Sequence, residues 1–169
     1  MKKKPLVLIV LSALFAALIM VVTACVLHIP TGLNEGYIHL GDTMIYIAAS
    51  MLPLPYAMAA AAVGGALADI LSGSLLWAPF TAVIKALMVL PFTAKNDRLL
   101  CRRNAIATVI AGVIGIAGYF VAACLLYTPA SAVVEILPNL IQEAAGGVMY
   151  VLLALAMDRA KLKNRLQTL

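Results

Sequence analysis

Three ionisable residues interrupt long apolar runs of this sequence: Asp69, Lys85 and Glu143. A charged side chain in a hydrophobic segment is costly, and it usually serves a partner of opposite charge, a proton or a ligand. Asn139 and Gln142 precede Glu143 by four residues and one residue, so all three share one face of a helix. Amides and a carboxylate on one face can bind a small polar molecule through hydrogen bonds.

The segment NEGYIHLGD, residues 34–42, is the second polar feature of the chain. Its acids, amide, histidine and phenol could close over a ligand held by the polar helix face. Aromatic residues further along could stack on a flat ring, although such residues also collect where a membrane meets water. The predicted substrate-binding residues are therefore Asn34, Glu35, Tyr37, His39, Asp42, Trp77, Lys85, Tyr119, Asn139, Gln142 and Glu143.

Catalytic motifs are missing from the sequence. It has no GxxxxGK[ST] loop for nucleotide phosphates, no GxSxG around a nucleophilic serine and no HExxH pair. His28 and His39 do not have the spacing of metal ligands. We therefore expect no catalytic residue, no metal and no cofactor, and we do not expect an enzyme.

Composition places the chain in a membrane. Of its 169 residues, 64% are hydrophobic and 11% are charged, whereas a soluble domain has roughly 45–50% apolar and about 25% charged residues. All but one of the 12 Lys and Arg residues lie in three short segments, 2–4, 95–103 and 159–165. Basic clusters beside membrane spans mark the cytoplasmic side. The net charge of +5 is therefore attributed to topology and not to nucleic acid binding.

Six apolar segments are the helices expected to position the polar residues. They are residues 6–27, 42–52, 56–71, 79–92, 105–127 and 134–157. An even number of spans puts both termini and all three basic clusters in the cytoplasm. The predicted fold class is an all-α integral membrane protein, a six-transmembrane-helix bundle forming a single domain over residues 1–169. The expected location is the cytoplasmic membrane, with several crossings.

The second segment is too short to cross alone, since about ten helical residues rise only ~15 Å against a hydrocarbon core of ~30 Å. We expect the preceding polar segment to complete the crossing as irregular backbone lining a cavity, with Asp42 capping the helix.

Asp69 and Lys85 have similar expected depths, and they form either a structural ion pair or part of the binding site. Ala13 and Ala17 are either internal packing residues or a contact for another membrane subunit.

Three stretches resemble the substrate-binding S component of energy-coupling factor (ECF) transporters. They are GYIHLGDTMIYIAASML (36–52), GGALADILSGSLLWAPFTAVIKALM (64–88) and PNLIQEAAGG (138–147). The resemblance is to the group that takes up riboflavin, hydroxymethylpyrimidine, pyridoxine-like and related micronutrients. It implies a pocket near the outer face, and transport with a transmembrane coupling subunit and two ATPase subunits. It also implies that Ala13 and Ala17 contact the coupling subunit, and that the chain topples in the membrane to release its vitamin inside.

The expected ligand is a neutral or weakly charged heterocycle. The outer half of the predicted bundle has one lysine, no arginine and several acids, so a polyphosphate would find few cations. A hydroxymethylpyrimidine or pyridoxine-like ring is favoured, with riboflavin or a deazapurine as alternatives. The rival functions are a stand-alone small-solute carrier or channel, and an integral-membrane enzyme. We find neither the inverted repeats of a carrier nor an enzyme's nucleophile with its base.

Overall fold

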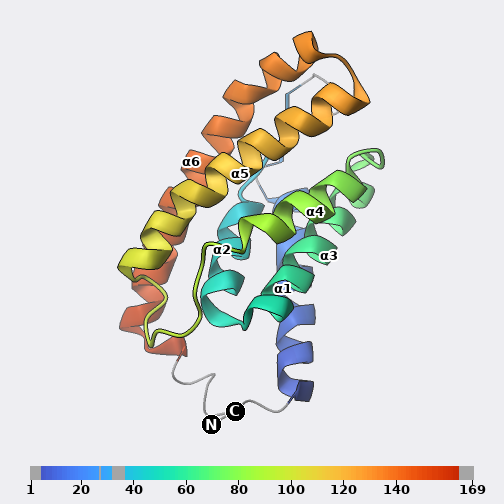
Figure 1. The fold of residues 1–169 in the computed structure, drawn as a ribbon. Helices are drawn as coiled ribbons and strands as arrows, with labels where there is room; N and C mark the ends of the chain where they lie inside the picture. Colours follow the sequence, from blue (N-terminus) through green and yellow to red (C-terminus); the bar gives the residue numbers. More distant parts are fainter. Residues whose placement is uncertain (1–4, 27, 32–36, 164–169) are drawn as a thin grey trace.

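The computed structural model describes residues 5–26, 28–31 and 37–163. Within them it contains six α helices and one short antiparallel ribbon (Figure 1). The ribbon pairs β1 (Ile29–Pro30) with β2 (Tyr37–Ile38). The helices are α1 (Pro5–Cys25), α2 (Gly41–Met51), α3 (Leu54–Ser72), α4 (Ala78–Met88), α5 (Arg102–Leu126) and α6 (Pro129–Arg159).

Four of these helices, α1, α3, α5 and α6, are long and apolar enough to cross a membrane. The other two, α2 and α4, have 11 residues each, which is a rise of about 16 Å against a hydrocarbon core of about 30 Å. A mostly helical membrane protein is therefore confirmed. Crossing of the membrane at all six segments stays a prediction.

The short helix α2 lies at the centre of the bundle. The α5–α6 hairpin packs on one side of it, and α1, α3 and α4 form the other group (Figure 1). All but two of the 11 residues of α2 are buried, as expected for a helix with no solvent face. Large apolar side chains such as Leu6, Val10 and Val109 are exposed on the outside of the bundle. An apolar surface of this extent indicates contact with lipid.

Two helix ends differ from the predicted segments for local reasons. α4 ends at Met88 and not at residue 92, because Pro91 cannot continue the helix and disfavours helical geometry in the residue before it. α6 begins at Pro129, five residues before the predicted 134. Thr128 and Ser131 form a capping box there, and proline is favoured at the first helical position.

The basic segment after α4 and the basic end of α6 lie together. Asp158 on α6 accepts a hydrogen bond from the Leu99 N–H at 2.8 Å, and Lys163 Nζ donates to the Asn96 carbonyl at 2.6 Å. α1 begins at this same end of the bundle (Figure 1). The structure therefore has one basic end, and the site described below lies toward the opposite end.

Gly64 is the point of close approach between α3 and α1. A Cβ atom added there would lie 2.7 Å from the Ala16 carbonyl oxygen and 2.8 Å from Ile19 Cβ. Neither atom can rotate away, so we expect Gly64→Ala to separate the helices and lower the free energy of unfolding by about 1–3 kcal/mol. Thermal unfolding in detergent measures this. Gly147→Ala is the matched control, because the nearest neighbouring atom lies 3.8 Å away. Equal melting temperatures of the two variants would refute the steric explanation.

Candidate functional site

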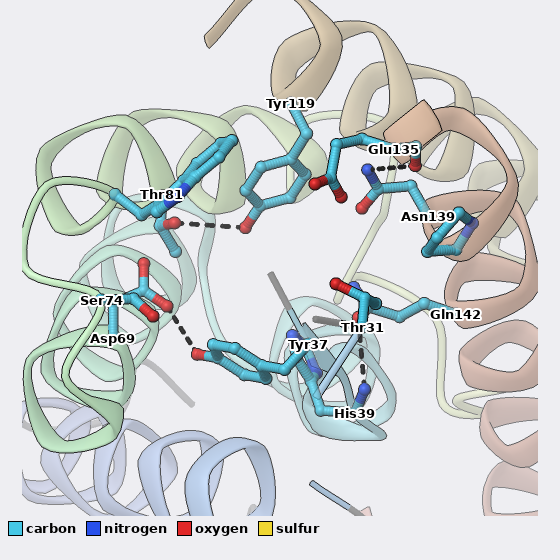
Figure 2. Close-up of a pocket in the computed structure, with 12 residues that line it drawn as sticks. Thr31, Tyr37, His39, Asp69, Ser74, Thr81, Tyr119, Glu135, Asn139 and Gln142 are labelled. Carbon is cyan, nitrogen blue, oxygen red and sulfur yellow. Dashed lines mark hydrogen bonds between the residues drawn. The ribbon is translucent and has the colours of Figure 1, made fainter. Parts of the chain in front are cut away.

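A pocket of about 480 Å³, measured with its mouth, opens between α3, α4, α5 and α6, away from the basic end. The ribbon closes one side of it (Figure 2). Its polar and aromatic lining comes from elements far apart in the chain. The lining residues are Thr31, Tyr37, His39, Asp69, Ser74, Trp77, Thr81, Tyr119, Glu135, Pro138, Asn139 and Gln142.

The α6 side of the pocket carries two amides, Asn139 and Gln142, beside Glu135 and Pro138. Asn139 Nδ2 donates to the Glu135 carbonyl at 2.8 Å, one turn earlier in the helix. Gln142 Oε1 accepts from the backbone N–H of His39 at 3.3 Å, and its Nε2 donates to Asp42 Oδ2 at 2.9 Å. Gln142 therefore links α6 by hydrogen bonds to α2 and to the residue that follows the ribbon. Asn139 is half-buried and lies nearer the opening.

The ribbon side carries Tyr37 and His39. The Tyr37 hydroxyl donates to Asp69 Oδ1 at 2.6 Å, and its ring stacks on His28 with centroids 4.1 Å apart. Burial and the Asp69 carboxylate raise the pKa of Tyr37, so this phenol keeps its proton. Burial lowers the pKa of His39 to about 4. Its Nδ1 accepts from the Gly41 N–H at 3.0 Å, which agrees with a neutral ring.

Aromatic rings form the third wall. The ring centroids of Trp77 and Tyr119 lie 5.9 Å apart, and the Tyr119 hydroxyl donates to Thr81 Oγ1 at 3.3 Å (Figure 2). Behind this wall, Lys85 Nζ lies 5.0 Å from the centroid of the Tyr119 ring. Flat aromatic faces beside amides suit a planar heterocycle with a hydrogen-bonding edge.

Of the two roles left open for Asp69 and Lys85, the structural ion pair is wrong. Lys85 Nζ lies 2.6 Å from Asp42 Oδ1, and these side chains are only 2% and 0% exposed. The reason is helix depth. The stem of Lys85 runs across Gly65, where an added Cβ would lie 3.1 Å from Lys85 Cγ, and Gly65 is one turn deeper than Asp69. Lys85 therefore reaches α2, and Asp69 instead accepts from Tyr37.

The role expected for Asp42 as a helix cap is also wrong. The cap position of α2 is Leu40, without a side-chain hydrogen bond, because the Asp42 carboxylate is already held by Lys85 and Gln142. Glu143 lies still deeper, where it accepts a hydrogen bond from the Tyr46 hydroxyl. These groups form a buried polar layer beneath the pocket.

The predicted residues thus divide by position. The structure gathers six of them around the pocket: Tyr37, His39, Trp77, Tyr119, Asn139 and Gln142. Asp42, Lys85 and Glu143 lie behind the lining, and Asn34 and Glu35 lie outside the described residues. Asp69, for which a role in the binding site was left open, also lines the pocket. Five further lining residues were not predicted to bind substrate: Thr31, Ser74, Thr81, Glu135 and Pro138. Glu135 could have been found, since it precedes Asn139 by one helical turn.

Two comparisons with known proteins bear on this site. A family model described as "ECF-type riboflavin transporter, S component" matches residues 4–159, nearly the whole chain. A protein of Pyrococcus woesei, described as "Uncharacterized protein in gap 3'region", is 33% identical over 138 residues. That alignment covers 78% of this chain and 92% of the relative.

Proposed function

Because this chain belongs to the family of ECF-type riboflavin transporter S components, we propose that its pocket captures a flat heterocyclic vitamin for import by an ECF transporter. The chain is a substrate-binding subunit of a membrane transporter and not an enzyme. One observation carries the proposal for the site. The amides of Asn139 and Gln142 and the rings of Trp77 and Tyr119 line the same opening.

In this proposal the ligand ring stacks against Trp77 and Tyr119, and its polar edge bonds Asn139 and Gln142. Tyr37 and His39 bound the ligand from the ribbon side, and Asn34 and Glu35, which lie outside the described residues, remain proposed ligand contacts. Asp42, Lys85 and Glu143 support the lining from behind, since their side chains are at most 6% exposed. Preorganised polar groups with aromatic walls are the usual composition of a small-molecule site.

The topology follows from charge. The basic end of the bundle faces the cytoplasm, so the pocket opens toward the outside of the cytoplasmic membrane. Both termini are cytoplasmic, and residues 1–169 form a single six-helix membrane domain. The short α2 needs no lipid contact of its own, because protein surrounds it on nearly every side.

The favoured ligand is a single ring of the hydroxymethylpyrimidine or pyridoxine type, with riboflavin and deazapurines as alternatives. Riboflavin is kept because the family description names it. None of the described residues that line the pocket is Lys or Arg, which disfavours phosphorylated forms.

Transport requires a coupling subunit and two ATPase subunits, and Ala13 and Ala17 on α1 are the proposed contact. Both are exposed, whereas Ala16 between them is buried. Small residues permit close packing of helices, so Ala13→Leu/Ala17→Leu is expected to reduce co-purification with the coupling subunit at least tenfold while ligand binding is retained. Ala117→Leu, at an exposed position on α5, is the control. Unchanged co-purification of the double variant would exclude this contact.

Uptake in proteoliposomes tests the function. The chain with coupling subunit, both ATPases and internal ATP should accumulate the labelled vitamin, and omission of the ATPases should stop uptake. Uptake by the chain alone would instead favour a stand-alone carrier or channel.

A further inference from the structure

Two carboxyl groups from different helices line the pocket. Asp69 on α3 and Glu135 on α6 both line it, and each is only 6% exposed. Figure 2 shows them on different sides of the same space, Asp69 beside Tyr37 and Glu135 beside Asn139. Two carboxylates that face one partly closed space raise the local concentration of cations.

Lys85 and His39 have partners of their own. Lys85 is paired with Asp42 at 2.6 Å and is buried, so its charge is already matched. His39 is neutral, because its Nδ1 accepts a hydrogen bond from the Gly41 N–H. The sequence of residues 28–31, 37–41 and 72–78, on the pocket side of the bundle, contains no Lys or Arg.

Asp69 also has unused bonding capacity. Its Oδ1 accepts from Tyr37 at 2.6 Å, while its buried Oδ2 has no hydrogen-bond partner among the residues that the structure describes. Buried carboxylate oxygens are normally satisfied by donors, because an unsatisfied one loses its hydration without replacement. A donor supplied by a ligand would complete this site.

From this arrangement we infer that the pocket selects a flat heterocycle carrying a positive charge, as a protonated amine or a cationic ring nitrogen. The charge lies toward Asp69 and Glu135, and the ring lies against Trp77 and Tyr119, whose electron-rich faces also favour cations. The inference rests on the proposed function and narrows its substrate class from neutral or weakly charged rings to positively charged rings.

Ligand pairs that differ only in charge test the inference on the intact chain in detergent. Pyridoxamine is compared with pyridoxine, and aminomethylpyrimidine with hydroxymethylpyrimidine, by titration calorimetry. Thiamine, riboflavin and pyridoxal phosphate extend the panel to a permanent cation, a larger neutral ring and an anion. We expect the cationic member of at least one pair to bind at least tenfold more tightly than its neutral partner.

Charge-neutral variants provide the second arm. Asp69→Asn/Glu135→Gln keeps the shape of both side chains, so we expect it to abolish the preference for the amine over its neutral partner. Asp97→Asn, at an exposed carboxylate near the basic end, should leave the preference intact. Thermal unfolding establishes that the variants are folded, and the comparison of ligands on the unaltered chain does not depend on them.

Three results would overturn the inference: neutral or anionic members that bind as tightly as cationic ones, an unchanged preference in the double variant, or no binding of any cationic probe. Failure of this inference can be distinguished from failure of the proposed function. If a neutral ring binds and ATP-dependent uptake is observed, the chain is still a vitamin-binding subunit and only the charge preference is wrong.

Discussion

Replacing Lys85 with Met is expected to lower the free energy of unfolding by about 3–5 kcal/mol, because it leaves the carboxylate of Asp42 buried without its cation. Asp42 is 0% exposed and Lys85 2% exposed, so water cannot take over the missing interaction. Only the Gln142 amide would still donate to the carboxylate. Chemical unfolding in detergent micelles, followed by circular dichroism, measures the loss.

The double variant Asp42→Asn/Lys85→Met tests whether Asp42 and Lys85 stabilise the bundle as an ion pair. It removes both charges, and the asparagine oxygen can still accept from Gln142, so most of the lost stability should return. Lys95→Met is the matched control, since that lysine side chain is exposed. A double variant that is less stable than Lys85→Met alone would show that the two charges do not stabilise the bundle as a pair.

Replacing Asn139 and Gln142 with Leu is expected to weaken ligand binding by about 100-fold or more, since each lost hydrogen bond is worth roughly tenfold in affinity. Asn139 and Gln142 differ in the hydrogen bonds that they make within the protein. Gln142 also donates to Asp42, so the double variant should melt at a lower temperature as well. Asn139→Leu alone should cost about tenfold in affinity with little change in stability, because Asn139 bonds only the Glu135 carbonyl of its own helix.

Thr108→Leu is the matched control for these variants. Its hydroxyl bonds the Ala105 carbonyl of the same helix, and it is not among the residues that line the pocket. Equilibrium dialysis with a labelled ligand gives the affinities. An affinity of Asn139→Leu equal to that of Thr108→Leu would remove Asn139 from the binding site.

The membrane class of the fold could be predicted because composition and hydrophobic run length are properties of the sequence alone. The central position of α2 could not. Its segment is the shortest of the predicted helices, and only the packing of α1, α3 and α6 around it shows that it is the core.

The partner of Lys85 could not be predicted for a related reason. Run length placed Asp69 and Lys85 at similar depth, but one helical turn decides which acid a lysine reaches. The path of the lysine stem across Gly65 is a tertiary feature with no signal in spacing. Thr31 and Ser74 lie outside the helices and the ribbon, where periodicity says nothing about direction, whereas the amides of α6 were predictable from their helical spacing.

Mass spectrometry of the small molecules that co-purify with the detergent-solubilised chain tests the central claim most directly, with Asn139→Leu and Asn139→Leu/Gln142→Leu purified in parallel. We expect a single heterocycle that is stoichiometric with the unaltered chain, reduced in the single variant and missing from the double variant. A heterocycle retained in equal amount by all three proteins would contradict the claim that this pocket is where the ligand binds.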